Sequence, residues 1–132
     1  FGGIGDRPGE FQRPSGMVWH DRRLYIVDAF NDRIQVFDGQ GRFLGVLGTQ
    51  DETSRLHYPY DIALGPKRDL WVIEYGAGRI SRFSLEGDLL GRFGSTGSGP
   101  NQFGTPWGLA VDSTRRIWVA DTRNHRLVSV DL

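Results

Sequence analysis

The sequence predicts an all-β fold made of three copies of one structural unit, and two observations carry this prediction. First, an apolar run ending in an acidic residue occurs three times in the 132 residues, at Asp28, Glu74 and Asp121, 46 and 47 positions apart. Second, each acidic residue is followed by a polar turn and a second apolar run. Two apolar runs of strand length around a short polar turn are typical of a β-hairpin. A fixed period of this length indicates a repeat protein.

Each repeat has room for four short strands. A proline precedes the first strand, as expected of a residue that cannot donate to a ladder. The first strands are predicted at 16–20, 61–65 and 108–112, after Pro14, Pro59 and Pro106. The second strands end at the acidic residues, and tight turns at 21–23, 66–69 and 113–116 precede them. The third strands are predicted at 33–38, 79–84 and 126–131. Fourth strands fit 41–48 and 87–94, and the last repeat has no counterpart of them.

The second strands are almost continuously apolar, as in L-Y-I-V (24–27) and L-W-V-I (70–73). A sheet with one wet face alternates, whereas a sheet packed between two others does not. Stacked four-stranded antiparallel sheets are the blades of a β-propeller. We therefore expect a single domain over 1–132, with repeats of about 1–46, 47–92 and 93–132. We expect it to form about three blades, the last lacking its outer strand, and to make up half of a propeller.

The last repeat resembles a known family most closely. Its segment W-V-A-D-T-R-N-H-R-L, from Trp118 to Leu127, is similar to the NHL repeat, and the resemblance extends over essentially the whole chain. The first repeat has Asp32 where the last has His125, and the second keeps only Glu74 and Arg79 of the motif. The resemblance implies a propeller of about six blades. It does not by itself imply a function, because one fold serves many.

Composition narrows the class of protein. The chain has 16 basic and 16 acidic residues, no cysteine and no apolar run of about 20 residues. Net charge therefore gives no support to a strongly charged partner, and disulfides and thiolate sites are excluded. The sequence contains no targeting or transmembrane segment and does not identify a compartment. Because it begins at Phe1 and not at methionine, we expect a processed product or a piece of a longer chain.

The acidic residue and the arginine of each hairpin are the first candidates for chemistry. They recur in every repeat, whereas a catalytic group is needed once. We therefore interpret them as structural clamps, in which the carboxylate accepts turn N–H groups and pairs with arginine. The pairs are Asp28 with Arg33, Glu74 with Arg79 and Asp121 with Arg126. The three histidines, His20, His57 and His125, share no repeat position and no ligand spacing, so we predict no catalytic residue, metal or cofactor.

Candidate ligand-binding residues stand directly after the prolines and in the hairpin turns. The peptide-amidating lyases, which resemble NHL propellers, place zinc-binding histidines at the first of these positions, and this chain has none there. Two of these positions hold aromatic residues instead, Tyr60 and Trp107, and aromatic side chains suit binding of a ligand or peptide. The candidates are Ser15, Tyr60 and Trp107 after the prolines, and Phe30, Tyr75 and Arg123 in the turns.

The function expected from these features is a non-catalytic scaffold that binds a protein, a peptide or a small ligand. Two copies are expected to form a homodimer that closes six blades, because an arc leaves apolar flanks in water. One alternative is a fragment of a metal-dependent propeller lyase or hydrolase whose catalytic residues lie in other blades. The other is binding of single-stranded RNA through basic pairs in the turns, 22–23, 67–68 and 115–116; nucleic acid is the less favoured partner because net charge is zero.

Overall fold

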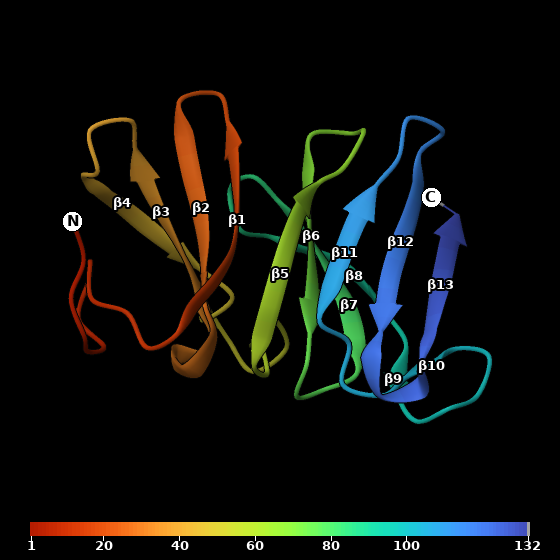
Figure 1. The fold of residues 1–132 in the computed structure, drawn as a ribbon. Coiled ribbons are helices and arrows are strands. Elements are labelled where there is room, and N and C mark those ends of the chain that lie inside the picture. Colours follow the sequence, from red (N-terminus) through yellow and green to blue (C-terminus); the bar gives the residue numbers. More distant parts are fainter. Residues whose placement is uncertain (132) are drawn as a thin grey trace.

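The computed structural model describes residues 1–131, and it contains three antiparallel sheets side by side (Figure 1). We number these sheets blades 1, 2 and 3. Blade 1 holds β1 (Pro14–His20), β2 (Arg23–Asp28), β3 (Arg33–Asp38) and β4 (Phe43–Leu47). Blade 2 holds β5 (Pro59–Leu64), β6 (Asp69–Glu74), β7 (Arg79–Ser84) and β8 (Leu89–Phe93). Blade 3 holds β11 (Gly108–Val111), β12 (Arg116–Asp121) and β13 (Arg126–Asp131).

The strand order within each blade follows the chain, as a meander of hairpins. The first strands, β1, β5 and β11, lie against one another from blade to blade. Figure 1 shows the two termini at opposite ends of this row of blades. The all-β propeller prediction is therefore confirmed, with three consecutive blades.

The predicted third strands coincide with β3, β7 and β13. The second strands start one residue earlier than predicted, so Arg23, Asp69 and Arg116 belong to strands and not to turns. The prediction that each proline stands just outside its strand is wrong for Pro14 and Pro59. These two residues begin β1 and β5 and pair with the acidic residue of the second strand, and a β-bulge follows each of them. A bulge leaves a residue outside the ladder, so a proline is tolerated there.

Two kinds of small element were not predicted. The turns after β2 and β12 contain single 3₁₀ turns, η1 (Ala29–Asn31) and η2 (Thr122–Asn124). Each ends in a residue with left-handed backbone, Asp32 (φ 51°) and His125 (φ 52°). Aspartate and histidine are among the residues that adopt this conformation most readily. The fourth-to-first-strand loop of blade 3 contains a short parallel pair, β9 (Ser95–Thr96) with β10 (Gln102–Phe103).

Two apolar cores lie between the blades. The core between blades 1 and 2 includes Val27, Ile34, Leu70 and Phe83. The core between blades 2 and 3 has six buried residues, which include Ile80 and Val119. Leu56 and Phe103, from the loops that enter blades 2 and 3, are fully buried in these cores, whereas Phe11 at the same repeat position is only half-buried. Each loop is thus tied to the blade that follows it.

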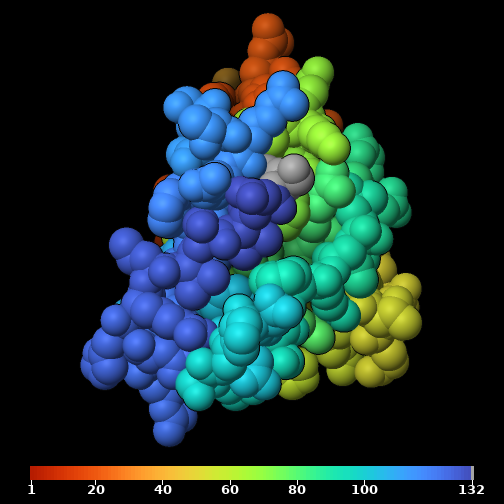
Figure 2. All heavy atoms as spheres, turned by 90° about the vertical axis from the view of Figure 1, so that its right-hand side faces the viewer, coloured from red at the N-terminus to blue at the C-terminus, as the bar shows by residue number. Residues whose placement is uncertain are grey.

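The outer faces of the row are open. Leu127 is 72% exposed, although Ile34 and Ile80 at the same repeat position are 0% and 1% exposed. On blade 1, Met17 is 59% exposed where Ile62 and Leu109 are 4% and 8% exposed. We call the outward side of blade 3 the forward face (Trp118, Ala120, Leu127, Ser129) and that of blade 1 the rear face (Met17, Trp19, Leu24, Ile26). Figure 2 views the molecule from the side of blade 3.

Candidate binding face

The hairpin of blade 3 holds the loop that enters the blade. The Asp121 carboxylate is fully buried and accepts hydrogen bonds from the backbone N–H of Gly104 at 2.6 Å, from Asn124 Nδ2 at 2.9 Å and from Arg126 Nε at 2.7 Å. The rest of the Arg126 guanidinium donates to the backbone carbonyls of Ser98, Gly99 and Gln102. One carboxylate and one guanidinium therefore fasten both the N–H and the C=O groups of the same loop.

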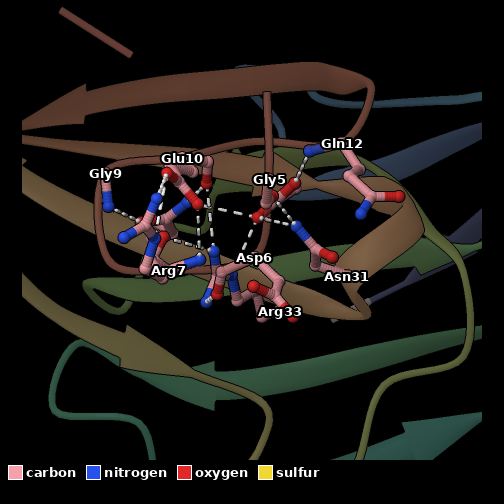
Figure 3. A network of polar contacts seen from close by, with 10 residues as sticks. Gly5, Asp6, Arg7, Gly9, Glu10, Gln12, Asn31 and Arg33 are labelled. Carbon is pink, nitrogen blue, oxygen red and sulfur yellow. Dashed lines mark hydrogen bonds and ion pairs between the residues drawn. The ribbon is translucent and has the colours of Figure 1, made fainter. Parts of the chain in front are cut away.

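Blade 1 repeats this arrangement (Figure 3). The buried Asp28 carboxylate accepts from the backbone N–H of Gln12, from Asn31 Nδ2 and from Arg33 Nε, at 2.8, 2.9 and 2.8 Å. Arg33 also donates to the carbonyls of Asp6, Arg7 and Glu10. Both oxygens of the Asp28 carboxylate and all three nitrogens of the Arg33 guanidinium therefore have hydrogen-bond partners within the blade, as the clamp interpretation expects.

Blade 2 reaches the same result with different residues. Its carboxylate comes from Glu74, which is longer by one methylene and accepts from the backbone N–H of His57 at 2.7 Å. Arg79 pairs with this carboxylate at 2.8 Å, and Ser81 Oγ donates to it from the repeat position at which Gln35 donates to Asp28 in blade 1. Blade 2 thus keeps the carboxylate–arginine pair and the bond to the entering loop without an asparagine in its turn.

Aromatic side chains form a continuous series beside these clamps. Tyr60 and Trp107 stack with ring centroids 5.5 Å apart and planes within 18°. Tyr75 lies 6.2 Å from Tyr60 and 6.3 Å from Trp107. Tyr58 continues the series, 4.9 Å from Tyr75 and stacked on Tyr60 at 6.5 Å. We call this series, with Phe30 at its far end, the aromatic ladder.

The far end of the aromatic ladder carries a positive charge. Phe30 meets Tyr58 edge to face at 5.1 Å, and the Arg13 guanidinium lies 5.3 Å from the Phe30 ring centre. Arg13 Nη1 also donates to the Tyr58 hydroxyl at 3.3 Å. Phe30 and Trp107 are 50% and 48% exposed, so the ladder reaches solvent at both ends. It runs across all three blades at the end of the strands where the clamps lie.

The structure brings four of the six predicted binding residues into the ladder, namely Phe30, Tyr60, Tyr75 and Trp107. Ser15 lies beside it and donates from Oγ to the Tyr60 carbonyl at 2.6 Å, joining blades 1 and 2. Arg123 is not part of the ladder. It is exposed in the turn of blade 3 and lines a separate hollow of about 230 Å³ with Ser98 and Asn124.

Sequence reasoning missed Tyr58, a member of the ladder, and Arg13, which lies against its Phe30 end. Both stand directly before a proline, and both have left-handed backbone, with φ of 59° and 47°. Thr105 occupies the same repeat position with φ of 45°. Positive φ is uncommon for residues other than glycine. Three pre-proline residues at one repeat position were the available signal, but residue type alone does not show where their side chains point.

Asp61 lies between the first strands of the neighbouring blades. Its Oδ1 accepts from the backbone N–H of Ile62 at 2.9 Å, and its Oδ2 accepts from the backbone N–H of Leu109 in blade 3 at 3.1 Å. On the other side it fills the space next to Gly16 of blade 1. Burial raises the pKa of this carboxyl, and the two N–H donors only partly offset that effect.

The pKa of Asp121 moves in the opposite direction. Burial alone would raise it, but hydrogen bonds from Asn124, from the backbone N–H of Gly104 and from Arg126 outweigh burial and hold the pKa below the usual aspartate value. Asp121 is therefore held as an anion inside the clamp. This is the state that binds the loop, and it leaves the residue unsuited to take up a proton near neutral pH.

Other chemistry has little geometric basis in residues 1–131. No group of three or more His, Cys, Asp or Glu side chains there could hold a metal ion. The same region contains no helix of the length and hydropathy needed to cross a bilayer.

The basic pairs in the turns do not all occupy the same repeat positions. Arg22, Arg68 and Arg115 share the left-handed position of their turns, whereas Lys67 precedes that position. In blade 2 the next residue is Asp69, so the six charges do not form one regular set.

Comparisons with known proteins agree with this architecture. The family model for the NHL repeat matches residues 103–128. The chain is 31% identical over 137 residues to "Protein brain tumor" of Drosophila melanogaster, covering 99% of this chain and 12% of that protein. It is 28% identical over 120 residues to "NHL repeat-containing protein 3" of Homo sapiens, covering 89% and 33%. The chain thus spans a third or less of the length of these relatives.

Solved structures show the same fold. A structure titled "Streptogramin B lyase structure" superposes with a TM-score of 0.66 at 17% identity, covering 90% of this chain and 40% of that chain. A luciferin-regenerating enzyme superposes with a TM-score of 0.64 at 17% identity, covering 84% and 38%. Identities this low concern the fold alone. The family model therefore recognises an NHL repeat in residues 103–128 of this chain, and the solved structures show that the chain has the fold of a β-propeller.

Proposed function

We propose that the chain is a non-catalytic binding scaffold and that the aromatic ladder is its ligand-contacting surface. The observation that supports this most directly is the continuity of the ladder across three blades, with solvent-exposed rings at both ends. The clamps hold the loops around it, so the rings sit on a rigid support. Rigid aromatic groups supply a large contact area at a low entropy cost, which is why they dominate protein and peptide interfaces.

The ladder favours a peptide or protein segment over a deep-pocket ligand. Its rings extend in a row and not around a cavity, and Arg13 adds a donor at one end. A segment with apolar side chains could lie along the rings while its carbonyl groups accept hydrogen bonds from Arg13. The acidic residues of the clamps are already paired with arginines, so their charges would not repel the carbonyl groups of such a segment.

A selection from a random peptide library tests this function. The parent chain should select peptides, and Trp107→Ala should weaken their binding by roughly 30-fold or more, as expected of a large aromatic contact. Trp19→Ala is the matched control, because Trp19 is 56% exposed but lies on the rear face of blade 1. Peptides that bind the Trp107→Ala variant as well as the parent would contradict the proposal.

We further propose that two copies close a six-bladed propeller. The support is that the forward and rear faces carry, at the same repeat positions, the apolar residues that are buried between blades 1 and 2 and between blades 2 and 3. On the rear face, Met17 and Ile26 line a hollow of about 500 Å³ together with Phe1 and Ile4. Trp118 and Leu127 of a second copy are the residues that would enter it.

Light scattering at micromolar protein tests the dimer. The parent should have twice the monomer mass, and Leu127→Asp should be monomeric because it places a charge on the forward face. Leu90→Asp is the control, since Leu90 is 49% exposed on strand β8 and outside both faces. A folded parent that stays dispersed as a monomer contradicts self-assembly without affecting the ladder proposal.

The two alternative functions are separated by simple assays. Stoichiometric zinc or calcium in the purified chain would favour an enzyme of the propeller lyase or hydrolase kind over a scaffold. Binding of oligonucleotides that falls steeply between two salt concentrations would favour single-stranded RNA as the ligand. The scaffold proposal expects neither result.

A further inference from the structure

A hollow at the loop end of blade 3 lies apart from the aromatic ladder. Its volume is about 230 Å³, several times the ~30 Å³ share of one water molecule, so a small ligand group fits in it. It is lined by the loop segment 96–98, by Gly104 and by the turn residues Arg123 and Asn124. In Figure 1 these segments lie near the labels β9 and β10, beside the turn that joins β12 to β13. All of its walls therefore come from blade 3 and from the loop that enters it.

The loop around this hollow is held in the same way as its counterpart in blade 1. In both blades the turn asparagine and the clamp arginine donate hydrogen bonds to two consecutive carbonyls of the loop, at 2.9–3.2 Å. The bonds run from Asn124 to Gly97 and from Arg126 to Ser98 in blade 3, and from Asn31 to Gly5 and from Arg33 to Asp6 in blade 1 (Figure 3). Because the acceptors are backbone groups, the side chains of the loop can differ between the blades without loss of these bonds.

Three residues that line the hollow have different side chains from their counterparts in blade 1. The pairs are Thr96 with Ile4, Ser98 with Asp6 and Arg123 with Phe30. Blade 3 thus has a guanidinium and two hydroxyl groups where blade 1 has a carboxylate and two apolar side chains. Hydroxyl groups and the arginine fork donate hydrogen bonds, and this fork matches the oxygens of carboxylate and phosphate groups. In blade 2, Gly76 stands at the arginine position, so this set of donors occurs once in residues 1–131.

These donors have no partner in the part of the chain that the structure describes. The arginines of the three clamps each pair with a buried carboxylate. Within residues 1–131, by contrast, no hydrogen bond or ion pair engages the guanidinium of Arg123 or the hydroxyl groups of Thr96 and Ser98. Phe30, at the Arg123 position of blade 1, is 50% exposed although blade 2 lies next to it. This repeat position therefore faces solvent even where another blade follows, and Arg123 is open to a ligand.

We propose that this hollow binds a terminal phosphate group, with Arg123 as the counter-charge and with Thr96 and Ser98 as hydroxyl donors. Such a group, as in a phosphate monoester, carries about 1.5–2 negative charges at pH 7 and three terminal oxygens that accept hydrogen bonds. Three donor side chains around one hollow match these three oxygens, whereas a carboxylate or a phosphodiester offers two. Among the described residues no acidic side chain lines the hollow, so nothing there repels the anion.

An NMR titration of the 132-residue chain tests the site. The probes are inorganic phosphate, which is a free anion, and phosphoserine with both ends capped, which represents a phosphorylated side chain; the tighter of the two identifies the source of the group. We expect saturable shifts of the amide signals of 96–98 and 123–124, and none at 4–6 and 30–31 of blade 1. Diethyl phosphate, a diester, should bind at least tenfold more weakly. Absence of saturation with both probes, equal shifts in blade 1, or equal affinity for the diester would overturn the proposal.

Two substitutions that copy blade 1 test the site on the protein. Arg123→Phe and Ser98→Asp should both fold, because the loop of blade 1 has the same hydrogen bonds with these residues. Arg123→Phe should weaken the tighter probe by roughly tenfold or more through loss of a charge-assisted hydrogen bond, and Ser98→Asp should abolish binding by placing a like charge in the hollow. Arg22→Gln is the matched control, since Arg22 is also exposed but lies in the turn between β1 and β2, at the opposite end of the strands.

The control variants also separate this site from the aromatic ladder. Arg22→Gln and Trp107→Ala should both bind the probe like the parent. Unchanged binding by Arg123→Phe, or equal weakening by Arg22→Gln, would show that the hollow is not the site. Loss of probe binding in Trp107→Ala would place the anion on the ladder instead and would equally overturn the proposal.

Discussion

Tyr60 and Trp107 stack across the boundary between two blades, with ring centroids 5.5 Å apart and planes within 18°. Tyr60 stands at the start of blade 2, and Trp107 directly precedes the first strand of blade 3. The stack therefore does two things: it forms part of the proposed binding surface, and it ties the blades together at the end where the loops converge. A ligand that lies on these rings would contact both blades at once.

The stack should be measurable as an energetic coupling. We expect the double-mutant cycle of Tyr60→Leu and Trp107→Leu to give about 0.5–1.5 kcal/mol, the usual range for an aromatic pair beyond its buried area. Urea denaturation of the four proteins measures it. Phe30 and Trp107, at opposite ends of the ladder, serve as the reference pair and should couple by less than about 0.3 kcal/mol. Equal couplings in the two cycles would contradict the stack as a specific contact.

Two glycines at the same repeat position should respond differently to alanine. A Cβ on Gly16 would meet the Asp61 backbone at 2.7 Å and the Asp61 carboxylate more closely still, whereas a Cβ on Gly108 would find its nearest atoms at 3.7 and 3.9 Å. We expect Gly16→Ala to lower the free energy of unfolding by about 2–3 kcal/mol through overpacking between blades 1 and 2. Gly108→Ala should change it by less than about 0.5 kcal/mol. Thermal or urea unfolding would show equal effects if the first strands did not pack as described.

The clamp of blade 3 should contribute strongly to stability. Asp121→Asn leaves Arg126 without its counter-charge. Because the Arg126 side chain is 34% exposed, solvent reduces the free-energy cost of the unpaired charge. We expect a decrease of about 2–3 kcal/mol in the free energy of unfolding, below the ~3–5 kcal/mol of fully buried pairs. The control is Asp131→Asn, whose partner Arg116 is 45% exposed and whose own carboxylate is 83% exposed. Its effect should stay within about 0.5 kcal/mol, because exposed pairs contribute little.

The repeat allowed the fold to be predicted from sequence because the clamp marks the strands it joins. The acidic residue ends one strand and the arginine opens the next, so β3, β7 and β13 were located correctly. Where a strand begins without such a mark, the prediction was less accurate. The prolines enter β1 and β5 because bulges release them from the ladder, and no sequence feature signals a bulge.

The aromatic ladder was only partly predictable for a different reason. Phe30, Tyr60, Tyr75 and Trp107 stand at positions where the repeat itself places them at one end of the strands. Tyr58 and Arg13 join them because left-handed backbone before each proline fixes the direction of their side chains. The carbonyls of Arg13 and Tyr58 accept hydrogen bonds from the backbone N–H groups of Ala29 and Tyr75 in the hairpin turns, so this conformation accompanies the docking of each loop on its blade. It is therefore a property of the assembled blade and not of the dipeptide.

Asp61 and Asp121 should titrate on opposite sides of the ordinary aspartate value of about 3.9. Burial between the first strands raises the pKa of Asp61, whereas the donors of the clamp hold the pKa of Asp121 down despite its burial.

These two pKa shifts change the stability of the fold with pH in opposite directions. The contribution of Asp121 is fully present above its unfolded pKa and is lost as pH falls through its lower folded pKa. For Asp61, the folded chain binds the proton more tightly than the unfolded chain, so its ionised form opposes folding above the folded pKa and this cost disappears as pH falls. Carboxyl-carbon NMR against pH measures both values. Finding Asp61 below Asp121 would contradict the assigned hydrogen bonds of both carboxylates.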